Sequence, residues 1–130
     1  QVKCVEWDTQ LTDSTYAEKE LFSGQITVQE GSKVVAQASV GRYVSASGTW
    51  GKAYEMRLYV GSVLIQDTEH VGPNSSGEES FQHNLMGQTG VLTAGTYTIK
   101  ITGSQIVSTN NHYFNRTPRS SWLIMQEIAQ

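Results

Sequence analysis

The segment Ser120-Ser-Trp-Leu-Ile-Met-Gln-Glu-Ile128, close to the end of the chain, decides the fold class. Its apolar side chains alternate, with Trp122 and Ile124 on one side and Leu123 and Met125 on the other. Successive side chains of a strand point to opposite faces, so this pattern predicts a strand that is buried on both faces. Chain ends fray unless a sheet holds them. We therefore expect the chain's own core to cover one face and a neighbouring subunit to cover the other.

Outward from this strand, the chain repeats short alternating segments that end at turn residues. The clearest are 34–40, 54–60 and 96–102, each with apolar residues at every second position over most of its length. Gly61-Ser62 follows the second of them as a two-residue turn with glycine first, which suits the twist of a β-hairpin. About eight such strands, with no segment of sustained helical spacing, predict an all-β sandwich or barrel.

The composition is that of one turn-rich β-domain. The chain has 130 residues, a common size for a single domain, and we expect 1–23 to form an extended, partly structured lead-in to a domain at 24–130. Its net charge is −3 and it has no run of Lys or Arg, which argues against nucleic-acid binding. No apolar run has the length of a transmembrane helix, so we expect no membrane insertion. The single cysteine, Cys4, cannot form an intrachain disulfide.

The order of these strands resembles the jelly-roll heads of the C1q and tumour-necrosis-factor type, above all the versions found on tailed-bacteriophage virions. The resemblance covers residues 24–128. It rests on the strand at 33–40, Met56-Arg-Leu-Tyr-Val60 with its glycine turn, Leu92-Thr-Ala-Gly-Thr-Tyr-Thr-Ile-Lys-Ile101, and the closing Ser-Ser-apolar strand.

This resemblance implies an antiparallel jelly-roll β-sandwich that forms a threefold homotrimer. In such heads the C-terminal strand lies near the threefold axis, which agrees with the two apolar faces of the last strand. We therefore expect Trp122, Leu123 and Met125 at the trimer interface, together with Tyr59.

Catalytic and metal-binding patterns are absent from the sequence. No Gly-x-Ser-x-Gly motif, His-x-His or Cys-x-x-Cys spacing occurs, and His83 alternates with Phe81 and Leu85 as a half-buried strand residue would. The neighbours Glu78 and Glu79 point to opposite faces of any strand, so they cannot flank one glycosidic bond. A calcium site would need loop carboxylates to converge, and solvated loop charge is the favoured alternative. We expect no enzymatic activity, no cofactor and no metal.

The long segment 103–119 is the candidate ligand-binding region. It gathers amide, guanidinium and aromatic groups, the groups that bind sugar hydroxyls and the C–H faces of sugars. The same groups make protein–protein contacts, and their aromatic rings could instead pack into the core or a trimer interface. The candidate ligand-binding residues are Asn110, Asn111, His112, Tyr113, Asn115 and Arg116, with Trp50 from a separate turn.

These observations and the resemblance predict a non-enzymatic bacteriophage virion surface protein that binds a host-surface receptor or glycan as a trimer. A capsid-decoration protein that stabilises the phage head is one alternative, and a carbohydrate-binding module of a larger protein is another. The expected partners are two further copies of the chain, other capsid or tail proteins, and a host glycan or protein. The expected location is the surface of the virion.

The trimer is directly testable. If a neighbouring subunit covers the last strand, light scattering at micromolar concentration should give three times the mass of one chain, because obligate interfaces of this kind persist on dilution. A monomeric mass would remove the argument from the last strand.

Overall fold

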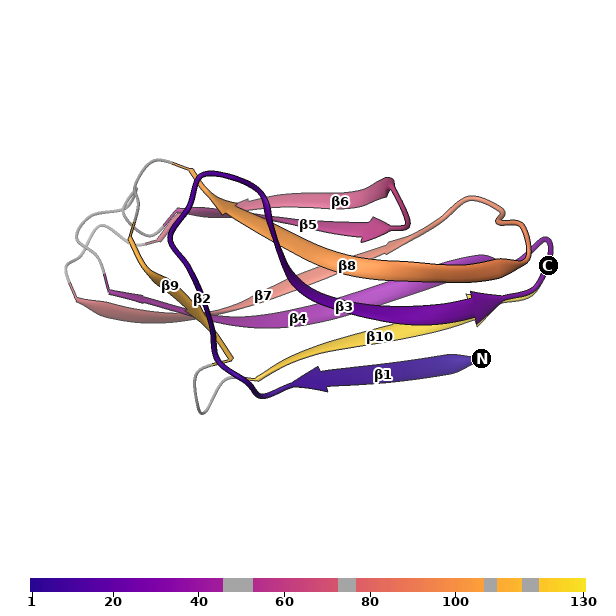
Figure 1. The fold of residues 1–130 in the computed structure, drawn as a ribbon, viewed down its shortest axis with the longest axis horizontal. Coiled ribbons are helices and arrows are strands. Elements are labelled where there is room, and N and C mark those ends of the chain that lie inside the picture. Colours follow the sequence, from indigo (N-terminus) through magenta and orange to yellow (C-terminus); the bar gives the residue numbers. More distant parts are fainter. Residues whose placement is uncertain (46–52, 73–76, 107–109, 116–119) are drawn as a thin grey trace.

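The structure is a computed structural model, and it describes residues 1–45, 53–72, 77–106, 110–115 and 120–130. All regular secondary structure in these ranges is β-strand (Figure 1). The strands are β1 (Val2–Trp7), β2 (Leu11–Asp13), β3 (Lys19–Val28), β4 (Lys33–Ser45), β5 (Tyr54–Val60), β6 (Val63–His70), β7 (Glu78–Gln88), β8 (Gly95–Gln105), β9 (His112–Phe114) and β10 (Ser121–Ile128). Over this part of the chain, no helix has the length and apolar character needed to cross a membrane.

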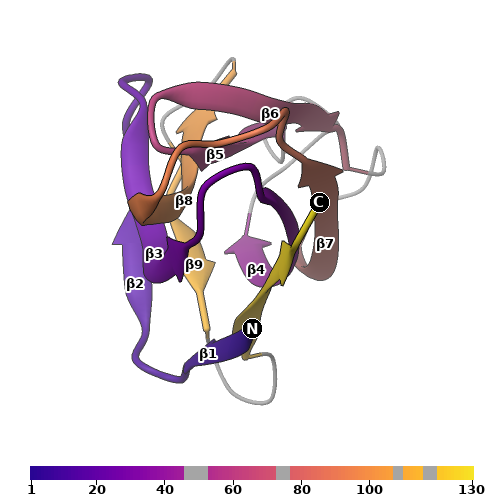
Figure 2. The same cartoon turned by 90° about the vertical axis from the view of Figure 1, so that its right-hand side faces the viewer.

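The strands form two antiparallel sheets. The first has the order β1-β10-β4-β9-β2, with β7 along the other side of β4, and the second has the order β3-β8-β5-β6. The long strand β4 pairs with β10 through its first half and with β9 near its end. The core series β1-β10-β4-β7 facing β3-β8-β5-β6 is the arrangement of a jelly roll. The predicted antiparallel jelly-roll sandwich is therefore confirmed, and an end-on view shows both sheets curving around one interior (Figure 2).

The core lies between the sheets and follows the period of the strands. In β5, Tyr54, Met56, Leu58 and Val60 are buried, whereas the residues between them are partly exposed. The loop-like segment predicted at 103–119 is in part strand instead, because β8 continues to Gln105 and β9 pairs with both β4 and β2. Residues 1–23 contain β1, β2 and the start of β3, and they contribute to both sheets.

The position of the closing strand β10 contradicts part of the predicted subunit interface. Leu123 and Met125 are completely buried within the single chain. They lie beside Ala38 and Ala36 of β4, whose small side chains leave them room. The Met125 side chain also reaches the opposite sheet, since a Cβ built on Gly24 would lie 2.9 Å from its Cε. Both residues are therefore core residues and not trimer contacts, whereas Trp122 and Ile124 on the outer face of β10 are partly exposed.

The hairpin between β5 and β6 has the predicted turn. Val60 pairs with Val63, so Gly61 and Ser62 are the two turn residues, and Gly61 has a φ of 59°. A side chain at this φ is strained, which explains why glycine stands first in the turn.

The substitution Gly61→Val should lower the free energy of unfolding by about 1–3 kcal/mol, because valine strongly disfavours a positive φ. Gly90→Val is the matched control. Gly90 has no positive φ and nothing within 4 Å of its built Cβ, so this change should have little effect. Urea unfolding of both variants measures the difference, and equal losses would contradict the strained-turn explanation.

Candidate functional site

Two of the predicted ligand-binding residues are buried inside the sandwich. His112 has no exposed surface and Asn115 is 4% exposed. Asn115 has a φ of 58°, and its side-chain amide donates to the carbonyl oxygen of Thr9 at 3.1 Å. In β9, His112 and Phe114 point inward and Tyr113 is only half-buried. The prediction that His112 and Asn115 contact a ligand is therefore wrong, because pairing of β9 with β4 turns His112 toward the interior and Asn115 is buried against Thr9.

Three of the remaining predicted residues lie in the described part of the chain and keep some exposed surface. Asn111 is exposed, Asn110 and Tyr113 are half-buried, and the Tyr113 ring lies 6.1 Å from that of Tyr43 between centroids. Trp50 and Arg116 lie outside the described residues.

His112 belongs to a buried cluster around Arg42. The Arg42 side chain, from β4, is 1% exposed. Its Nε donates to Nε2 of His83 at 2.8 Å, and its two terminal nitrogens donate to Nδ1 of His112 at 2.7 Å and to Nδ1 of His70 at 3.0 Å. A guanidinium only donates, so each imidazole must accept with an unprotonated nitrogen. All three histidines are therefore neutral in this arrangement.

Burial gives the cluster its electrostatic character. It lowers the pKa of His83 to about 2 and that of His112 to about 3, and the charge of Arg42 adds to both shifts. Burial also lowers the pKa of Arg42 to about 9, so the guanidinium is still charged at neutral pH. The pKa of His70 is lowered for the same reasons. His83 and His112 cannot exchange a proton near neutral pH, so the cluster is suited to holding a cation and not to acid–base catalysis through these two residues.

Aromatic rings complete the surroundings of Arg42. Its guanidinium carbon lies 4.6 Å from the ring centroid of Phe81 and 5.5 Å from that of Tyr54, distances at which the ring faces attract a cation. The Tyr54 hydroxyl donates to Oδ2 of Asp13 at 2.6 Å. Burial and this hydrogen bond raise the pKa of Tyr54, so it stays protonated.

Among the described residues, no group of three or more His, Cys, Asp or Glu side chains is placed to hold a metal ion. The three histidines that do converge all accept a hydrogen bond from Arg42. No residue set in this part of the chain suggests a bound cofactor.

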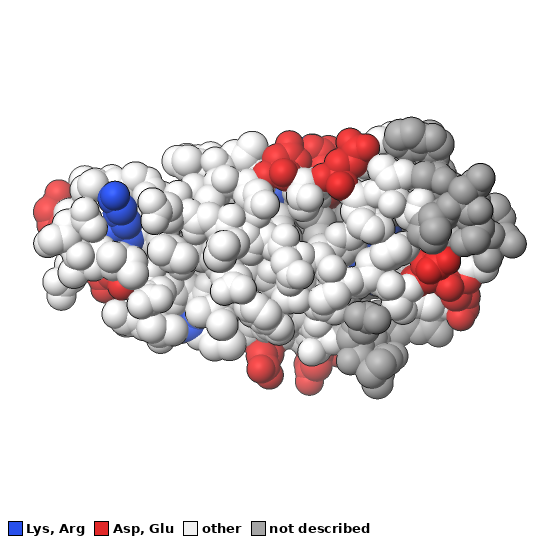
Figure 3. Space-filling view, turned by 180° about the vertical axis from the view of Figure 1, so that it is seen from behind, with Lys and Arg blue, Asp and Glu red and all other residues white. Residues whose placement is uncertain are grey.

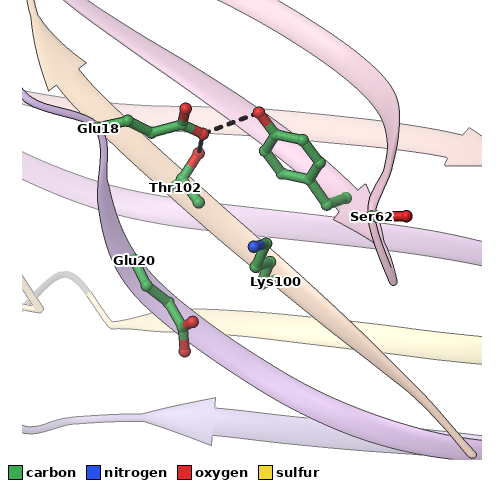
Figure 4. A pocket seen from close by; sticks show the side chains of 6 residues that line it. Glu18, Glu20, Ser62, Lys100 and Thr102 are labelled. Atoms are coloured by element: carbon green, nitrogen blue, oxygen red, sulfur yellow. Dashed lines mark hydrogen bonds between the residues drawn. The ribbon is translucent and has the colours of Figure 1, made fainter.

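A polar groove lies on the outer face of the second sheet and is the stronger candidate for a binding site (Figure 4). Its volume is about 340 Å³, at the low end of the range of roughly 300–1,000 Å³ that ligand sites occupy. Cross-strand register builds it, because Tyr59 of β5 pairs with Lys100 of β8, and Glu20 of β3 pairs with Thr102 of β8. The lining residues are Glu18, Glu20, Tyr59, Ser62, Lys100 and Thr102.

One wall of the polar groove is fixed by Glu18. Its Oε1 accepts hydrogen bonds from the Thr102 hydroxyl at 2.5 Å and from the Tyr59 hydroxyl at 2.8 Å. The Thr102 hydrogen bond is the largest influence on this carboxyl, which has a lowered pKa and is ionised at neutral pH. The Tyr59 ring is held in turn by Lys100, whose Nζ lies 5.1 Å from the ring centroid.

Other groups in the groove remain available to a ligand. The side chains of Glu20 and Ser62 make no hydrogen bond to any other described residue. Glu20 supplies an acceptor, Ser62 both a donor and an acceptor, and Lys100 a donor with a positive charge. The groove thus offers a rigid wall together with polar groups that a bound molecule can satisfy.

The sequence alone singled out only Tyr59 among the groove residues, and it did so as a trimer-interface residue. Glu20, Lys100 and Thr102 occupy outward positions on strands with the predicted alternation, but only the pairing of β3, β8 and β5 brings them together. The available signal was the row of polar residues on the outward face of 96–102.

The two remaining trimer-interface candidates lie on opposite faces of the sandwich. Tyr59 is in the polar groove on the second sheet, and Trp122 is half-exposed on the outer face of the first. A view from behind shows a surface that is mostly uncharged, with acidic groups more prominent than basic ones (Figure 3). This agrees with the net charge of −3.

Comparison with known structures supports the fold and leaves the family open. No protein-family model matches the chain, and no curated protein sequence matches it. The chain is similar to a structure described as "EclA C-terminal domain; sugar-binding protein", with 14% identity and a TM-score of 0.52, over 97% of this chain and 79% of the other. It is also similar to the structure of infectious bursal disease virus, Gx strain, with 12% identity and a TM-score of 0.52, over 97% of this chain and 32% of the other. At such low identity both likenesses concern the β-sandwich fold alone.

The buried cluster makes the fold sensitive to acid. The unfolded chain binds protons on histidine near pH 6.5, whereas folded His83 and His112 bind them only near pH 2 and 3. The stability that these two residues contribute is complete above pH 6.5. The free energy of unfolding should fall below that pH, by up to about 1.4 kcal/mol per pH unit for each imidazole. Urea unfolding at pH 7, 6, 5 and 4 measures this slope.

The double variant His83→Gln with His112→Asn separates this effect from the titration of carboxylates. The glutamine and asparagine oxygens replace Nε2 and Nδ1 as acceptors for Arg42 but do not titrate. The variant should lose stability less steeply than the wild type between pH 6.5 and 4. Parallel curves would show that the histidines do not cause the acid sensitivity.

Proposed function

We propose that this chain is a non-enzymatic β-sandwich domain that binds carbohydrate through the polar groove. The observation that carries the proposal is the groove itself, in which Glu18, Tyr59 and Thr102 hold one another and Glu20, Ser62 and Lys100 stay available. Sugar hydroxyls both donate and accept hydrogen bonds, so a site with a carboxylate, a hydroxyl and an ammonium group around a small depression matches them. The similar structure described as a sugar-binding protein adds support at the level of the fold.

The groove also fits a binding role better than a catalytic one. Its two carboxylates differ in their hydrogen bonding. Glu18 accepts hydrogen bonds from Thr102 and Tyr59, whereas Glu20 has no partner among the described side chains. A hydrolase needs one carboxyl with a raised pKa to act as the acid. The pKa of Glu18 is lowered, so this carboxyl does not meet that requirement.

We place this activity on the surface of a virus particle, in keeping with the resemblance to jelly-roll heads of tailed-bacteriophage virions. In this role the domain attaches the particle to a glycan or glycoprotein of the host surface. Three copies in a homotrimer would turn a weak single-site affinity into useful avidity. A carbohydrate-binding module of a larger protein would use the same groove as a single copy.

A second candidate function is capsid decoration, and the outer face of the first sheet favours it. Val2 and Met86 are each 62% exposed there, and Trp122 and Ile124 are half-exposed between them on β10. A surface with several exposed apolar side chains is typical of protein contacts. In this function the first sheet would bind neighbouring capsid subunits.

A glycan array probed with the purified chain tests the leading proposal. The variants Lys100→Ala and Glu20→Gln should each weaken binding to any recognised glycan by about tenfold or more, because each removes a hydrogen bond that involves a charged group. Their melting temperatures should stay close to that of the wild type, since both residues lie on the outer face of the sheet.

The matched controls are Lys33→Ala and Glu6→Gln, which make the same changes on the first sheet. They should leave glycan binding intact. If the array shows no bound glycan while the chain sediments with capsids, and if Trp122→Ala prevents this, the decoration function replaces the leading one.

A further inference from the structure

A second depression, which the proposed function does not use, opens beside the polar groove. It lies between the β5–β6 turn and the connection from β7 to β8 and has a volume of about 410 Å³. We call it the apolar cleft. Its lining residues are Val60, Gly61, Ser62, Val63, Thr89, Gly90, Val91, Leu92 and Tyr97.

The lining of the apolar cleft is uncharged, and two of its hydrophobic residues are strongly exposed. Val63 is 59% exposed and Val91 is 64% exposed, one on each side of the opening. Exposed apolar side chains that gather at one place indicate a binding site, whereas single ones do not. The absence of charge from the lining suits an apolar group.

The cleft is formed before any ligand arrives. On one side, the backbone of Leu92 exchanges two hydrogen bonds with the β3–β4 turn: its N–H donates to Ser32 at 2.8 Å, and its carbonyl oxygen accepts from Gly31 at 3.0 Å. Thr89 N–H donates to the carbonyl oxygen of Val34 at 2.9 Å. On the other side, Gly61 N–H donates to Thr98 at 2.8 Å. Rigid walls lower the entropic cost of binding an apolar group there.

The two depressions share a residue. Ser62 lines both the polar groove and the apolar cleft. Ser62 therefore adjoins the polar groove, which contains Glu20 and Lys100, as well as the apolar cleft, which contains Val63 and Val91.

We propose that the preferred ligand is a glycan that carries an apolar substituent, such as the alkyl or acyl chain of a glycolipid. The sugar occupies the polar groove and the substituent enters the apolar cleft past Ser62. This inference rests on the proposed carbohydrate binding and deepens it by naming the class of glycan. It also accounts for the exposed valines, which a site for a simple neutral sugar does not require.

Titration of the ¹⁵N-labelled chain by NMR tests this directly. The probes are the methyl and n-octyl glycosides of glucose, galactose, mannose and N-acetylglucosamine, each kept below its micelle concentration. For a sugar that binds, the octyl glycoside should bind about tenfold or more tightly than the methyl glycoside, because two or more methylene groups become buried. The amides of Val63 and Val91 should shift with the octyl glycoside and not with the methyl glycoside.

The variants Val63→Asp and Val91→Asp should remove this advantage and leave methyl glycoside binding unchanged. Both residues are exposed, so the variants should fold. Val2→Asp is the matched control, since Val2 is 62% exposed on the first sheet, and it should bind both glycosides as the wild type does.

Three results would overturn the inference. If methyl and octyl glycosides bind equally, the proposed function stands and the apolar cleft has no part in it. If the octyl glycoside binds Lys100→Ala as tightly as the wild type, the cleft takes the alkyl chain without the sugar. If Val63→Asp lowers the mass measured by light scattering, the cleft is a contact between copies. Failure of every glycoside of both series to bind would instead remove the proposed function itself.

Discussion

The interaction on which the structure depends most is the set of contacts around the buried guanidinium of Arg42. It joins the two sheets, because Arg42, His83 and His112 come from the first sheet, whereas His70 and Tyr54 come from the second. A buried cation without partners would cost several kcal/mol, so each of these groups is constrained in place and in protonation state. The same cluster also restricts position 103 to glycine, since a Cβ at Gly103 would lie 2.3 Å from the Tyr54 ring that packs on Arg42.

This cluster also decides where binding chemistry is available. All three histidines of the chain act as acceptors for Arg42, which leaves no imidazole for catalysis or metal binding. The groups left for recognition are the carboxylates, hydroxyls and ammonium on the outer face of the second sheet, and the apolar residues around the β5–β6 turn. That turn lies at the opposite end of the sandwich from β9, which carries His112 (Figure 1). The buried cation is therefore separate from the β5–β6 turn, where we propose that the apolar part of a ligand binds.

The sequence predicted those features that local pattern controls. The alternation in β5 and the Gly61 turn needed no partner to be recognised, the succession of strands predicted a sandwich or barrel, and the resemblance to jelly-roll heads supplied the jelly roll. Prediction from the sequence failed where a residue far away in the chain determines whether a side chain is buried or exposed. His112 stands in a polar segment, yet Arg42, seventy positions earlier, makes its burial favourable. Leu123 and Met125 looked like contacts to another subunit, but Ala36, Ala38 and Gly24 make room for them inside one chain. The polar groove was not predicted because it exists only through the register of three strands.

The two outer faces of the sandwich differ in chemistry, and this difference bears on both candidate functions. The second sheet presents a fixed polar site around Glu18 and Tyr59, whereas the first presents the partly exposed apolar side chains of Val2, Trp122 and Met86. A domain that must be anchored to a larger assembly and also reach a ligand needs two such surfaces on opposite sides, because one surface cannot serve both at once. Glycan binding through the second sheet and attachment through the first are therefore compatible. If Tyr59 took part in a subunit interface, that contact would cover the polar groove, so a trimer formed through Tyr59 would exclude the proposed glycan site.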